Sequence, residues 1–78
     1  MKAGEIVKTI MERKGIRPSD MAKRLQISQQ ALAGRFTQKN ISMDKMNDML
    51  RTMDYEIYII PTDCKIPAQW KDRVYKVD

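Results

Sequence analysis

The sequence has no histidine and only one cysteine, Cys64, among its 78 residues. These two absences exclude an intrachain disulfide and a zinc site built from cysteine and histidine. They also argue against an enzyme, because Cys64 has Lys65 beside it but no evident general base, and no glycine-rich phosphate loop is present. A lone thiol is typical of the reducing cytoplasm, so we expect a cytoplasmic protein without a metal or cofactor.

Long hydrophobic runs are also missing from the chain. The longest, residues 57–61, is far shorter than the roughly 20 apolar residues that span a membrane. Residues 1–5 lead directly into a mixed apolar and charged stretch, so we expect neither a signal peptide nor membrane contact. What the chain does have is basic charge: Lys and Arg total 15 against 10 Asp and Glu, a net charge of +5 that suits a polyanionic partner.

Apolar residues recur at helical spacing in the first third of the chain. They predict a helix over 4–14 that ends at Gly15, where glycine adopts a left-handed conformation at low steric cost. A second helix should begin near Pro18 or Ser19, since proline is favoured in a first turn. The inner faces of these two helices would be formed by Ile6, Val7, Ile10, Met11, Met21, Ala22 and Leu25.

Two further helices follow from the capping residues. Ser28 is a good N-cap for a helix over about 29–37, with Leu32 and Phe36 as its buried anchors. Ser42 similarly caps a fourth helix, whose methionines indicate flexible core packing. We expect the apolar set of this helix to be Met43, Met46, Met49, Leu50 and Met53.

The helical period ends at residues 55–60, which are rich in aromatic and β-branched side chains and so predict a strand that Pro61 stops. Its backbone would pair with the same segment of a second copy, pair internally with 73–77, or simply fold back on its own domain. We therefore expect a mainly α protein. A four-helix domain over 1–54 would precede a C-terminal strand or hairpin in 55–78 that mediates dimerisation.

The most informative stretch is 18–32, which predicts two short helices joined by a tight turn. The second of these helices opens with Gln29 and Gln30 directly behind its serine cap. Glutamine can hydrogen-bond both N6 and N7 of adenine in the major groove. Sequence-specific DNA binding is therefore the leading hypothesis.

A resemblance rests on Ala22, Leu25, the Ile27-Ser28 turn and Leu32. Through these positions residues 5–54 resemble the helix-turn-helix domain of the phage Cro/repressor-like (XRE-type) family of transcription regulators. The Ser28-Gln29-Gln30 opening is similar to the start of recognition helices in some lambdoid phage repressors. The resemblance implies a lambda-repressor-like fold and a small phage-type repressor.

The chain departs from this family at two positions. Gln26 stands in the turn where the family usually has glycine, so this residue should bear left-handed backbone strain. Pro18 stands where many relatives have glutamine, and it has no backbone N–H to donate to a phosphate. We expect the start of the second helix to grip DNA less well than in those relatives.

The helix over 29–37 would read the bases through Gln29, Gln30, Ala33 and Gly34, with Ala33 against a thymine methyl group. The glycine either lets the backbone approach DNA closely or is merely tolerated, at a cost of about 1 kcal/mol relative to alanine. Phosphate contacts, which position a protein without specifying sequence, would come from Arg17, Ser28, Arg35, Thr37, Gln38, Lys39, Asn40 and Lys45.

Dimerisation would supply the second reading helix. In a twofold dimer the two helices lie about 34–36 Å apart and meet successive major grooves of double-stranded DNA, which predicts an inverted-repeat operator. The residues that we expect at the contact between subunits are Tyr55, Ile57, Tyr58, Ile59 and Ile60.

These features predict a DNA-binding transcriptional regulator, a homodimeric repressor that controls its own operon in a bacterial or phage-infected cell. A chain of 78 residues leaves no room for a separate sensing domain, so we expect no small-molecule ligand. The alternative is a protein-interaction module on the same helical frame, such as a phage-encoded inhibitor of a host nuclease or polymerase. An antitoxin-type regulator is a further alternative.

Overall fold

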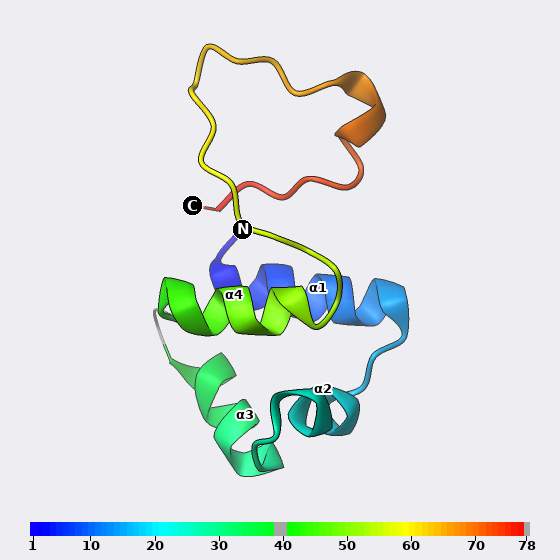
Figure 1. The fold of residues 1–78 in the computed structure, drawn as a ribbon, viewed down its shortest axis with the longest axis vertical. Coiled ribbons are helices and arrows are strands. Elements are labelled where there is room, and N and C mark those ends of the chain that lie inside the picture. The colour runs from blue at the N-terminus through cyan, green and yellow to red at the C-terminus, as the bar shows by residue number, and fades with distance from the viewer. Residues whose placement is uncertain (39–40, 78) are drawn as a thin grey trace.

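Four α-helices form the body of the molecule in the computed structural model, which describes residues 1–38 and 41–77. Helices α1 and α4 pack side by side, and the α2–α3 pair lies against one side of them (Figure 1). The four predicted helices are thus confirmed, and a short 3₁₀ helix, η1, is added to them. The bounds are α1 (Ala3–Lys14), α2 (Pro18–Leu25), α3 (Gln29–Thr37), α4 (Met43–Arg51) and η1 (Ala68–Trp70).

The helix ends follow the local signals of the sequence. Gly15 ends α1 with a φ of 67°, and Gln26 ends α2 in the same left-handed region with a φ of 57°. The hydroxyls of Ser28 and Ser42 each accept a hydrogen bond from the backbone N–H three residues later, at 3.0 and 3.2 Å. Both serine caps and the strained turn residue are therefore confirmed.

The core lies between α1, α2 and α4, with α3 closing it from one side. Met43 is the exception to the predicted apolar set, because 65% of its surface is exposed. As the first residue of α4, it precedes the stretch that packs on the other helices. Leu25 and Phe36 are partly buried against the core, whose fully packed members are Ile6, Val7, Ile10, Met11, Met21, Ala22, Leu32, Met46, Met49, Leu50 and Met53.

The predicted C-terminal strand or hairpin is wrong: the described residues contain no strand. Residues 55–60 leave the helices and 73–77 return to them, closing a loop beyond α1 and α4 (Figure 1). No backbone hydrogen bond joins these two segments within the described chain. They meet instead through the rings of Tyr55 and Tyr75, whose centroids are 6.4 Å apart. Strand propensity reflects packing on a half-buried sheet, and Ile59 has no such surface, since it is 91% exposed.

The end of α1 holds the base of this C-terminal loop, defined as residues 55–77. One guanidinium nitrogen of Arg13, Nη1, donates to the hydroxyl of Tyr75 at 2.6 Å and to the carbonyl of Asp72 at 3.0 Å. The ammonium of Lys14 donates to the carbonyl of Met53 at 2.6 Å. The loop is therefore fixed at its base by side chains. Within the described residues, no helix has the length and apolar character needed to cross a bilayer.

Candidate nucleic-acid interface

The turn between α2 and α3 sets the direction of the third helix. The backbone N–H of Ile27 donates to the carbonyl of Ala22 at 3.0 Å, which closes the end of α2. Ala22 and Leu32 are both buried, so the two helices pack closely on either side of the turn. The left-handed conformation of Gln26 allows the chain to reverse within so few residues.

One side of α3 is turned to solvent. Successive residues of an α-helix are rotated by about 100°, so the direction opposite buried Leu32 falls between Gln30 and Gly34. Gln29 and Gln30 are exposed in the first turn of the helix. Neither amide has a hydrogen-bond partner within residues 1–38 and 41–77. Ala33 is exposed as well and Gly34 is half-buried. The residues predicted to contact bases therefore lie along one solvent-facing side of the helix, which we call the outer face of α3.

The residues predicted to contact phosphates differ in how available they are. Gln38 and Lys45 are exposed, whereas Lys39 and Asn40 lie outside the described residues. The hydroxyl of Thr37 donates to the carbonyl of Gly34 at 3.0 Å and is turned back onto its own helix. Ser28 already uses its hydroxyl oxygen as the cap of α3.

The two predicted arginines are each constrained. Arg35 is half-buried, and its Nη1 atom is inaccessible and has no hydrogen-bond partner in the described chain. Arg17 is exposed, but its Nε lies 3.3 Å from a carboxylate oxygen of Asp20, which also accepts the backbone N–H of Arg17 at 3.0 Å. These bonds, the backbone one first, hold the pKa of Asp20 below its ordinary value of 3.8. Asp20 therefore places a negative charge beside one of the predicted phosphate ligands.

One contact between α1 and α3 had no signal in the sequence. The ammonium of Lys8, on α1, lies 5.2 Å from the centre of the Phe36 ring on α3. Such a cation–π contact fixes the second half of α3 against the first helix. Helical spacing identifies Lys8 only as a polar residue, and nothing local connects it to a ring 28 positions away.

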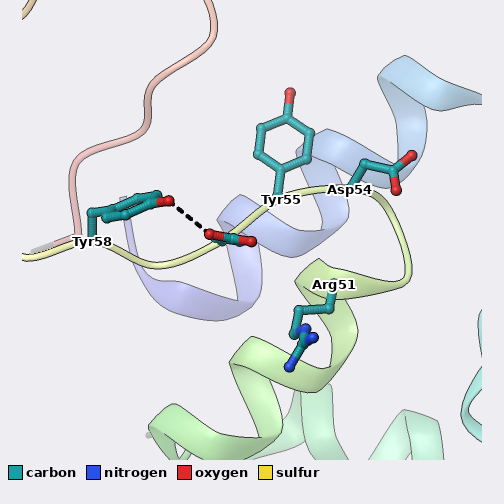
Figure 2. Close-up of a pocket in the computed structure, with 5 residues that line it drawn as sticks. Arg51, Asp54, Tyr55 and Tyr58 are labelled. Carbon is teal, nitrogen blue, oxygen red and sulfur yellow. Dashed lines mark hydrogen bonds between the residues drawn. The ribbon is translucent and has the colours of Figure 1, made fainter.

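A pocket of about 600 Å³ lies at the end of α4. Its lining side chains do not converge: Arg51 and Tyr55 point in opposite directions, and only Tyr58 and Glu56 meet (Figure 2). The hydroxyl of Tyr58 donates to Glu56 at 2.7 Å, and this bond raises the pKa of Tyr58 above its ordinary value of 10.0. Within the described residues no cluster of acidic residues and cysteine could hold a metal ion. The outer face of α3 is therefore the better candidate site.

No protein-family model, curated protein or solved structure matches the chain. The resemblance of residues 5–54 to the Cro/repressor-like family accordingly stays a prediction. The case for a nucleic-acid interface depends on the geometry and chemistry of α3 and its surroundings.

Proposed function

We propose that this chain is a sequence-specific DNA-binding transcriptional regulator, a homodimeric repressor that reads an inverted-repeat operator with α3. The main support is the position of Gln29 and Gln30, whose amides are exposed in the first turn of a capped helix and have no hydrogen-bond partner among the described residues. Residues near the start of a recognition helix are those that reach base edges when it lies in the major groove. The regulated operon would be its own, in the cytoplasm of a bacterial or phage-infected cell.

The charge of the chain supports the same partner. The net charge of +5 favours association with a polyanion, and the ammonium of Lys45 is exposed in the first turn of α4. Binding should weaken as salt rises, because each neutralised phosphate releases condensed counterions.

The shape of the molecule limits how two copies can share one duplex. The chain measures 40 × 24 × 16 Å, with the α2–α3 pair at one end of the long axis and the C-terminal loop at the other (Figure 1). A twofold axis that runs roughly along this long axis would let both α3 helices face one duplex. Two copies would then meet at the flanks of their loops, where Tyr58 and Ile59 are 74% and 91% exposed. Of the predicted dimer residues, Tyr55 and Ile57 are partly buried against their own core.

A second candidate function is a protein-interaction module on the same frame. The observation that favours it is the number of exposed apolar side chains in the C-terminal loop, among them Ile59 and Trp70, the latter 51% exposed. Exposed apolar side chains mark a protein contact when they form one patch, which a partner would cover. In this reading the basic charge would serve solubility rather than DNA binding.

Selection of duplexes from a random pool at defined salt separates the two candidates. The repressor proposal predicts recovery of a palindromic sequence, and a linear fall of the logarithm of affinity with the logarithm of salt concentration. An interaction module would enrich no sequence, and that result would overturn the proposal.

A further inference from the structure

Gly34 lies in the middle of the outer face of α3. It is one helical turn after Gln30 and is rotated by about 200° from buried Leu32. Gln30 projects a long side chain from the preceding turn, whereas Ala33 has only a methyl group and the exposed Thr37 bonds its hydroxyl back to the carbonyl of Gly34 at 3.0 Å. The outer face of α3 therefore has no projecting side chain at its centre.

Nothing within the fold requires a glycine at this position. Of the glycines, which all lie in the described chain, only Gly15 has a positive φ. No atom of residues 1–38 or 41–77 would lie within 4 Å of a Cβ atom added at Gly34. A glycine inside a helix weakens it relative to alanine, because the unfolded chain has more backbone freedom to lose. The residue thus destabilises α3 without an intramolecular contact that compensates.

The other two glycines, Gly15 and Gly4, differ in whether alanine could replace them. Gly15 has a φ of 67°, where a side chain would be strained. Gly4 lies in the first turn of α1, and a Cβ there would make an ordinary contact, 3.5 Å from Cδ1 of Ile41. Gly4 therefore offers a matched control, a helical glycine that alanine can replace at a position away from the outer face of α3.

We infer that Gly34 determines how deeply α3 enters the major groove, an inference that rests on the proposed DNA-binding function. The missing side chain lets the helix backbone approach the edges of the base pairs, which is a recurring use of glycine at ligand sites. At that depth the methyl group of Ala33, as well as the longer amide side chain of Gln30, can contact bases. Gly34 is thus a specificity-determining residue through the space that it leaves for the DNA.

The test compares Gly34→Ala and Gly4→Ala with the parent protein. Both variants should melt at higher temperature, by about 4–8 °C for Gly34→Ala. Only Gly34→Ala should bind the duplex selected by the parent more weakly, by about tenfold or more in fluorescence anisotropy. Affinity for a scrambled duplex of the same composition should stay unchanged in both variants.

Three other results would contradict the role of Gly34 or the proposed function. If Gly34→Ala binds the selected duplex as tightly as the parent does, the inference is wrong and the proposed function stands. If Gly34→Ala melts below the parent, the glycine serves the fold itself and the inference is also wrong. If the parent selects no duplex at all, the proposed function fails and the inference fails with it.

Discussion

Gln29 and Gln30 lie in the first turn of α3, whose backbone is fixed by a cap and by packing. The Ser28 cap and the buried Leu32 fix the first turn of α3, so these amides lose little additional freedom on binding. Both residues and their exposure follow from the sequence, because the cap and the helical period are local signals. What the sequence leaves open at this scale is the pairing of Arg17 with Asp20 and the burial of Arg35.

Replacing both Gln29 and Gln30 by alanine should weaken specific DNA binding. We expect a loss of roughly 1–3 kcal/mol for each bidentate base contact that is removed. Binding to a scrambled duplex should be unaffected, because phosphate contacts remain. The measurement is a titration of labelled duplex at fixed salt, with Gln69→Ala in η1 as the control for removing an exposed amide. Parental affinity in the double variant would show that these amides do not read bases.

Asp20 should make the stability of the protein depend on pH. Hydrogen bonds from Arg17 lower the pKa of the folded carboxyl below 3.8, so the charged form stabilises the fold above that pH. The contribution is lost as pH falls through the lowered folded pKa. Asp20→Asn should therefore melt below the parent at neutral pH, and the difference should shrink in acid.

The matched control for this pH series is Asp63→Asn. It removes the same charge from the C-terminal loop, where the carboxylate has no hydrogen-bond partner among the described residues. Melting curves recorded from neutral pH down to acid compare the two variants. A difference between parent and Asp20→Asn that stays constant over the series would contradict the assignment.

At the scale of elements, prediction succeeded where the signal was local and failed where it depended on a partner. Caps at Ser28 and Ser42 and the glycine at 15 placed the helix ends, because each acts on backbone groups within three residues. Residues 55–60 have strand-forming side chains, but a strand exists only when a second segment hydrogen-bonds to it. In this chain 73–77 returns nearby and is held to α1 by Arg13 instead.

The cap of α3 should link stability to DNA binding. Ser28→Ala removes the acceptor for the Ala31 N–H and should cost about 1 kcal/mol of folding free energy. Ser42→Ala removes the equivalent bond at α4 and should cost about the same. Only Ser28→Ala should also weaken binding to the selected duplex at a temperature where both variants are folded. Equal binding by the two variants would show that the start of α3 is not at the interface.

At the scale of the molecule, two surfaces lie at opposite ends of one axis. Helix α3 offers amides and small residues at one end, and the C-terminal loop offers exposed apolar side chains at the other (Figure 1). Arg13 bonds to Tyr75, and the ammonium of Lys14 lies 5.4 Å from the centre of the Tyr55 ring, so both side chains hold the loop to α1. Lys8 on the same helix contacts Phe36 of α3. These contacts join residues far apart in the sequence, so helical periods and capping signals could not reveal them. In the proposed dimer, this fixed base would hold the loop in a set orientation toward the second copy.

Replacing Ile59 by aspartate tests whether the loop joins two copies. The side chain is 91% exposed, so the substitution should change the stability of one copy little. In a contact between copies the new charge would be desolvated, which is costly unless it is paired. We therefore expect the parent to sediment as a dimer at micromolar concentration and Ile59→Asp to sediment mainly as a monomer.

The matched control is Met43→Asp, which places the same charge on an exposed apolar residue of α4. It should leave the dimer intact, because α4 belongs to the helical body beneath the base of the C-terminal loop and not to the flanks of the loop (Figure 1). The same comparison extends to DNA. Since a monomer engages only one half-site, Ile59→Asp should bind a full palindrome no better than a single half-site, whereas the parent should favour the palindrome strongly. A parent that sediments only as a monomer, or an Ile59→Asp variant that keeps the parental preference for the palindrome, would remove the loop from the interface between copies.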